Sequence, residues 1–123
     1  MSNYRTPEAA HEAHVTYHLS PREVWEAQQA QPEYLPEAFA QDGFIHCTDG
    51  LDRLVEIANM FYTGDPREYV TLILDTEKLT SRVQYDDPDQ HFPHIYGPLN
   101  TDAVIGQLKV TRGEDGTFLT IGD

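Results

Sequence analysis

The sequence predicts one small α+β domain in which a split, mixed β-sheet is combined with two main helices. Short segments rich in β-branched and aromatic residues recur along the chain, as expected for strands. Residues 51–62 have the apolar spacing of a helix that buries one face. The length of 123 residues suits one hydrophobic core and is too short for two ordinary domains.

Residues 1–14 are predicted to be a flexible N-terminal extension, because they are small and polar and have no steady apolar period. The single domain is then expected to span residues 15–123. Its first strand is predicted within VTYHL, residues 15–19. Ser20 is the expected N-cap of a helix that reaches about Ala30, with Glu23 completing a capping box.

The next segment, residues 32–43, contains two prolines and its state is left open. GFIHC, residues 43–47, is predicted to be a short strand, followed by a helix with Thr48 or Asp49 as its cap. The side chains expected on the buried face of this helix are Leu51, Leu54, Val55, Ala58, Phe61 and Tyr62.

Four further strand segments follow. YVTLILD, residues 69–75, is nearly all apolar and is predicted to be a central strand covered on both faces. RVQY, residues 82–85, is a shorter candidate. Residues 103–112 and 117–121 are predicted to form a terminal hairpin.

FPHIYGPL, residues 92–99, is predicted to be a shaped loop, because Pro93, Gly97 and Pro98 restrict or release the backbone. GFIHCTDG, residues 43–50, also places a histidine in an apolar segment bounded by glycines. We therefore expect the two segments to share one site.

The net charge of the chain limits the classes of molecule that it is expected to bind. Twenty-one Asp and Glu against eight Lys and Arg give a formal charge of -13, which opposes binding to long nucleic acids and anionic membrane surfaces. A small nucleotide is still allowed, since a local group can bind its phosphate. The sequence has neither an apolar run of the ~20 residues that span a bilayer nor a signal-peptide pattern, so a cytoplasmic protein is expected.

Alternation along FIHCT places His46 and Thr48 on one face and Cys47 on the other, which argues against a His46 and Cys47 catalytic pair. Cys47 is predicted to be a buried apolar residue. His46 is either a core histidine bonded to the backbone or a ligand contact. Thr48 is either a helix cap alone or a cap that also contacts a ligand.

In FPHIYGPL, either His94 and Tyr96 stabilise a turn, or His94 carries a proton and the Tyr96 ring supports a ligand. His18 is a third candidate, with a half-exposed strand position as its alternative. Asp86 follows a predicted strand and either faces the site or is solvated. No histidine pair has a recognised metal-ligand spacing, so no metal site is predicted, and the sequence has no GxGxxG, P-loop or GxSxG motif.

The segments TYHL, WEA, GFIHCTD, ANMFY, LILD and FPHIYGPL, in that order over about residues 15–111, resemble the domain of unknown function 952 family of small bacterial proteins. That family is similar in proposed fold to the ADP-ribosyltransferase superfamily, in which two small sheets enclose a cleft for NAD. The family motif FIHxS matches Phe44 to Thr48, with threonine in place of serine. Asp86 stands where many members have glutamate.

The resemblance implies an ADP-ribosyltransferase-like domain that binds or processes NAD or a related small nucleotide. It implies no other cofactor. The residues implied as catalytic are His46, His94 and Asp86, and those implied as ligand-binding are His18, Thr48 and Tyr96. No residue matches the catalytic glutamate of classical transferases, so the alternatives are a noncatalytic small-ligand-binding module and a partner-binding protein with a structural histidine pair.

Overall fold

The structure is a computed structural model, and it describes residues 14–122. Its α-helices are α2 (Arg22–Gln28), α3 (Phe39–Asp42) and α4 (Leu51–Phe61). Its strands are β1 (Val15–Pro21), β2 (Glu33–Tyr34), β3 (Ile45–His46), β4 (Tyr69–Asp75), β5 (Arg82–Tyr85), β6 (Pro93–Tyr96), β7 (Leu99–Asn100), β8 (Val104–Arg112) and β9 (Phe118–Ile121). Two 3₁₀-helices, η1 (Thr76–Lys78) and η2 (Thr101–Ala103), complete the described elements.

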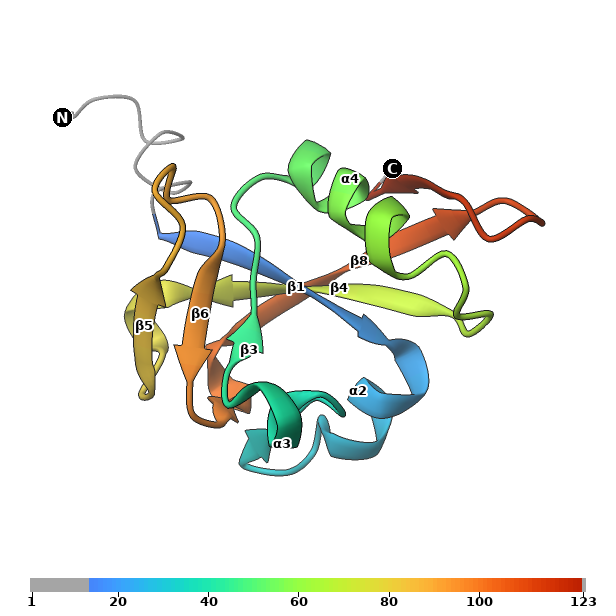
Figure 1. Cartoon of the computed structure of the whole chain (residues 1–123). Helices are drawn as coiled ribbons and strands as arrows, with labels where there is room; N and C mark the ends of the chain where they lie inside the picture. The colour runs from blue at the N-terminus through green and yellow to red at the C-terminus, as the bar shows by residue number, and fades with distance from the viewer. Residues whose placement is uncertain (1–13, 123) are drawn as a thin grey trace, which may run out of the picture.

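The strands form a four-stranded sheet in the order β1-β4-β8-β9, a three-stranded sheet in the order β3-β6-β5, and the pair β2-β7. An isolated bridge between Tyr17 and Thr48 links β1 to the segment that follows β3. The α4 helix packs against β1 and β9, as Figure 1 shows. Hydrogen bonds between the Asn59 side chain and the Phe118 backbone fix this contact.

The predicted α+β class is confirmed, and its details differ in two respects. All strand pairings between residues 14 and 122 are antiparallel, so the predicted mixed sheet is wrong. The described part of the chain also has a third, short helix and more strands than were expected. The additional elements are two to four residues long, which is too short to show a hydrophobic period. No helix within residues 14–122 is long and apolar enough to span a membrane.

The predicted capping box at Ser20 is wrong. Strand β1 continues through Ser20 to Pro21, which is the N-cap of α2, and the helix ends at Gln28 rather than near Ala30. Ser20 is fully buried, and its hydroxyl lies 2.9 Å from that of Tyr34. Ser20 is therefore a buried residue of the strand, and its hydroxyl bonds to buried Tyr34 instead of capping the helix.

The predicted cap of α4 is also wrong. The N-cap is Gly50, with φ 97°, and it makes no side-chain cap hydrogen bond. Thr48 instead exchanges two backbone hydrogen bonds with Tyr17, at 2.9 and 3.1 Å. The Asp49 carboxylate accepts a hydrogen bond from the Tyr85 hydroxyl at 2.6 Å. Thr48 and Asp49 therefore bond to residues of the two larger sheets and do not cap the helix.

FPHIYGPL is not a loop throughout, because Pro93–Tyr96 is the middle strand of the three-stranded sheet. Pro93 is the first residue of that strand, a position where its missing N–H costs least. The turn comes at Gly97, where a Cβ would lie 2.5 Å from the Ser81 hydroxyl oxygen. The glycine therefore permits the close approach that ends β6, after which Leu99–Asn100 pairs with β2.

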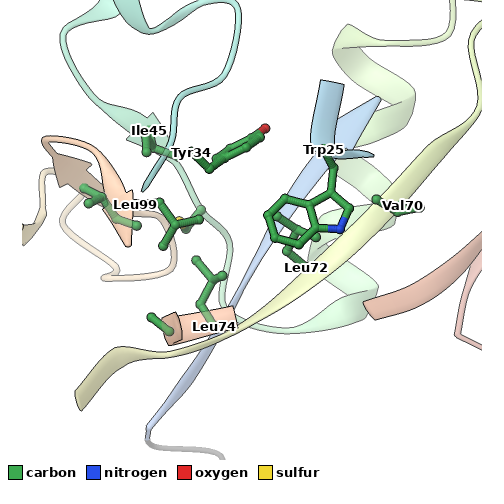
Figure 2. Close-up of a cluster of buried hydrophobic side chains, with 10 residues drawn as sticks. Trp25, Tyr34, Ile45, Val70, Leu72, Leu74 and Leu99 are labelled. Atoms are coloured by element: carbon green, nitrogen blue, oxygen red, sulfur yellow. The ribbon is translucent and has the colours of Figure 1, made fainter. Parts of the chain in front are cut away.

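The main core lies around β4, and the prediction of a central strand is confirmed, since β4 runs between β1 and β8. Figure 2 shows its buried cluster, with Trp25, Tyr34, Ile45, Val70, Leu72, Leu74 and Leu99 labelled. The buried face of β1 is polar by contrast, with Thr16, His18 and Ser20 at most 5% exposed. Because polar residues occupy the buried face of β1, His18 lies inside the fold.

Candidate functional site

His46 and His94 lie next to each other on two paired strands. In the antiparallel register of β3 and β6, His46 is directly opposite His94. Their ring centroids are 5.3 Å apart in an edge-to-face arrangement. The side chain of His46 is 53% exposed and that of His94 is 17% exposed. The two motifs therefore meet at the surface of the three-stranded sheet.

Each of these histidines is bonded to a carboxylate. His46 Nε2 lies 2.9 Å from Asp42 at the end of α3, and His94 Nδ1 lies 2.8 Å from Asp86 just after β5. In a neutral ring, the nitrogen that faces a carboxylate carries the proton and the other nitrogen accepts. The accepting atoms are then His46 Nδ1 and His94 Nε2, and neither has a hydrogen-bond partner within residues 14–122. Two adjacent nitrogens are thus left for a ligand or a proton.

Asp86 is the centre of a small hydrogen-bond network. It accepts hydrogen bonds from the Tyr96 hydroxyl, from His94 and from the Gln84 amide. These bonds, that of Tyr96 foremost, hold the pKa of Asp86 below its usual value. The same bond raises the pKa of Tyr96. At neutral pH, Asp86 is therefore a carboxylate and Tyr96 a neutral phenol.

Phe44 holds the histidine pair in place from the side. Its ring stacks on that of His94, with centroids 4.0 Å apart and planes 14° apart, and its edge contact with His46 is 4.8 Å. Sequence reasoning did not select Phe44 as a site residue, although alternation puts it on the same strand face as His46. Tyr96 is 5.3 Å from Phe44, and the Arg82 guanidinium lies 4.5 Å over the Tyr96 ring. The stacking of a ligand on Tyr96 stays a prediction.

His18 lies beneath His46 and is only 5% exposed, so the half-exposed alternative is wrong. Its Nδ1 is 2.7 Å from the His46 carbonyl oxygen, which can only accept, so this nitrogen carries a proton. Burial lowers the pKa of His18 to about 4, and the ring is neutral at pH 7. Nε2 is then the unprotonated nitrogen that faces the Tyr34 hydroxyl at 3.0 Å. His18 thus supports the backbone of His46, and its predicted contact with a ligand stays a prediction.

Two cavities adjoin at the histidine pair, because His46, Thr48, Ile57 and Tyr62 line both. The Arg67 arm, of about 190 Å³, extends from these residues to Tyr34, Glu37, Asp65, Arg67 and Tyr69. The Phe61 arm, of about 480 Å³, extends to Cys47, Phe61, Asp86, Asp87, Phe92 and His94. Together the two arms form the cleft.

The cleft runs along the side of α4 rather than at its N-terminus. Leu54, Ile57 and Phe61 face it, whereas Leu51 and Arg53 line a different cavity. A ligand contact was expected at Thr48 as the cap at the start of this helix, whereas the cavities lie along the side of the helix. Phe61, expected on the buried face, is 69% exposed, so it belongs to the rim of the cleft.

Thr48 lies where the two arms join. It is 4% exposed and lines both of them, and its hydroxyl has no hydrogen-bond partner in the part of the chain that the structure describes. The bridge to Tyr17 fixes its backbone. A hydroxyl held in this way is placed to bond a ligand in either arm.

Arg67 is the cation of the Arg67 arm, and its charge is already paired. Its guanidinium makes two-pronged contacts with Asp65 and with Glu37, at 2.8 to 3.1 Å. The bond to Arg67 lowers the pKa of Asp65. Sequence reasoning missed this group, and no local signal could have found it, because Glu37 and Arg67 meet only through the tertiary fold. Among residues 14–122, no group of three or more His, Cys, Asp or Glu side chains could hold a metal ion.

Comparison with solved structures finds protein CC0527 from Caulobacter crescentus. Its X-ray crystal structure is 26% identical with a TM-score of 0.71, and the match covers 85% of this chain and 93% of that chain. A double mutant of CC0527 is 25% identical with a TM-score of 0.70, over the same shares of the two chains. The solution NMR structure of CC0527 is 26% identical with a TM-score of 0.65, covering 83% of this chain and 89% of that one. No curated protein gave a significant match.

The family described as "Protein of unknown function (DUF952)" matches residues 19–107 of the chain. This range includes β3, α4, β4 and β6, and with them both histidine motifs. The family resemblance drawn from the sequence is confirmed over most of its length. The chain belongs to the DUF952 family.

Proposed function

We propose that the chain is an ADP-ribosyltransferase-like domain that binds NAD or a related small nucleotide in the cleft. The observation that carries the proposal is the pair His46 and His94, each bonded to a carboxylate and each with one nitrogen left over. Two adjoining cavities open beside the pair, and Thr48 lines both of them. The similarity in proposed fold between the family and the ADP-ribosyltransferase superfamily supports a nucleotide as the ligand.

Each side chain has a role in this proposal. His46 Nδ1 and the Thr48 hydroxyl bond the hydroxyls or the amide at the nicotinamide end of the nucleotide. The bond between ribose C1′ and the nicotinamide nitrogen breaks with its electron pair leaving on nicotinamide, and an oxygen nucleophile bonds to C1′. That nucleophile gives its proton to His94 Nε2, and Asp86 stabilises the resulting imidazolium. The sugar is cationic in the transition state, so a nearby carboxylate lowers its energy.

A noncatalytic binding module is the second candidate. Glu37 is the glutamate that lines the cleft in the described part of the chain, and both of its carboxylate oxygens are bonded to Arg67. A carboxylate engaged in this way is poorly placed to act as the catalytic acid of a transferase. This observation favours binding without turnover.

Calorimetry with NAD, ADP-ribose and nicotinamide tests the proposal. We expect the wild-type chain to bind NAD and His46→Ala and His94→Ala each to weaken binding about tenfold or more, because each loses a hydrogen bond in a partly desolvated site. His14→Ala is the control, since that histidine is bonded to Glu77 at the start of β1 and does not line the cleft.

Three outcomes are informative. NAD binding together with release of nicotinamide supports the transferase, and NAD binding without release supports the module. If the wild-type chain binds none of the three compounds, the proposal is wrong.

A further inference from the structure

We propose that the Phe61 arm takes an organic cation, such as a pyridinium ring or an alkylated ammonium group, in preference to a neutral or anionic molecule of the same shape. This inference rests on the proposed function, because it names the charge of the group that the cleft binds. It assigns a specificity role to Phe61, Asp86 and Asp87.

The charges that line the arm are negative. Asp86 and Asp87 contribute carboxylates, and no Lys or Arg lines the Phe61 arm in the described part of the chain. Asp87 accepts hydrogen bonds from the backbone N–H groups of His91 and Phe92 at 2.8 and 3.2 Å, which keeps it ionised and in place. Asp86 is held by three donors. A phosphate in this arm would meet two carboxylates without a balancing cation, so the arm excludes it.

The walls of the arm are aromatic and apolar. Phe61, Tyr62 and Phe92 line it together with Ile57. The face of an aromatic ring attracts a cation, and the attraction grows when water is excluded. Aromatic side chains and carboxylates that line the same cavity favour a weakly hydrated cation, such as a pyridinium or a methylated ammonium group, over a strongly hydrated metal ion.

Thr48 points independently to a ligand in this place. The residue is 4% exposed and lines the arm, and its hydroxyl has no hydrogen-bond partner within residues 14–122, although polar groups in a residue this enclosed are normally hydrogen-bonded. A cation that also carries an amide or hydroxyl group would satisfy it. The pyridinium ring of NAD with its carboxamide has both features, and the neutral dihydropyridine ring of NADH lacks the charge.

Three ring compounds that differ in charge test the inference. At neutral pH, N1-methylnicotinamide is a cation, nicotinamide is neutral and nicotinate is an anion. In calorimetric titrations at low salt we expect N1-methylnicotinamide to bind about tenfold more tightly than nicotinamide, with nicotinate the weakest. Raising the salt concentration should reduce this preference. Equal affinity for the first two compounds, or tighter binding of nicotinate, would overturn the inference.

Two adjacent variants show whether the Phe61 arm is responsible. Phe61→Ala should weaken binding of N1-methylnicotinamide about threefold or more through loss of one ring face. Met60→Ala is the matched control, because Met60 is 71% exposed, close to the 69% of Phe61, and does not line the arm. Both substitutions are at exposed positions, so the fold should be retained. A charge preference that is unchanged in Phe61→Ala would overturn the assignment to this arm.

The results also separate this inference from the proposed function. Binding of N1-methylnicotinamide without binding of NAD would support the cation site and contradict the nucleotide proposal. Binding of NAD with equal affinity for the charged and neutral rings would support the nucleotide proposal and contradict the cation site.

Discussion

The free energy of unfolding should fall by about 3 kcal/mol between pH 7 and pH 4 through His18 alone. Burial lowers the pKa of His18 in the folded chain to about 4, from an ordinary value of 6.5. Between these two values the unfolded chain binds a proton that the folded chain does not bind, so stability is complete above pH 6.5 and is lost as the pH falls toward 4. Each pKa unit corresponds to about 1.4 kcal/mol.

Denaturant unfolding at a series of pH values measures this effect. His18→Gln removes the titrating ring, so the number of protons taken up on unfolding between pH 4 and pH 6.5 should fall by about one, and the free energy of unfolding should depend less on pH. The loss of two hydrogen bonds should also lower the free energy of unfolding at every pH. His14→Gln changes an exposed histidine and should keep the wild-type slope. A wild-type slope in His18→Gln would show that another group causes the pH dependence.

Ile95→Ala should lower the free energy of unfolding by about 2 to 5 kcal/mol, the range found when a large aliphatic side chain is removed from a core. Ile95 is fully buried in β6 and pairs with Ile45 on one side and Val83 on the other. Its loss leaves a cavity behind the sheet that carries His46 and His94.

The control is Ile105→Ala, which removes the same atoms from a side chain that is 52% exposed. Its expected cost is about 1 kcal/mol or less. Thermal or denaturant unfolding of the two variants gives the comparison. Similar losses in both would mean that Ile95 does not anchor the three-stranded sheet.

Elements with a strong local period could be predicted from the sequence. The apolar run of β4, the helix at α4 and the β8–β9 hairpin all lie where the pattern placed them. The helix caps were mispredicted because a capping pattern is local, and tertiary contacts override it. Ser20 illustrates this, since it contacts Tyr34 instead of the start of α2.

The candidate site was predicted in part. The meeting of His46 and His94 followed from two similar motifs, and the structure places them opposite each other. The contact of His46 with Asp42 and the contact of Arg67 with Glu37 could not be predicted, because contacts between separate loops and helices leave no periodic signal. Residues 92–99 were predicted to be a loop because the two prolines restrict the backbone and Gly97 releases it, whereas the structure tolerates Pro93 at the start of the strand Pro93–Tyr96.

Cys47 gives the chain a built-in reporter of local opening. It is the one cysteine of the sequence, it is 2% exposed, and it lies next to His46 on the lining of the Phe61 arm. Burial raises the pKa of its thiol, so the reactive thiolate is scarce while β3 is in place. The rate at which an alkylating reagent modifies the protein therefore follows how often β3 detaches from β6, and a compound bound in the cleft should slow that modification.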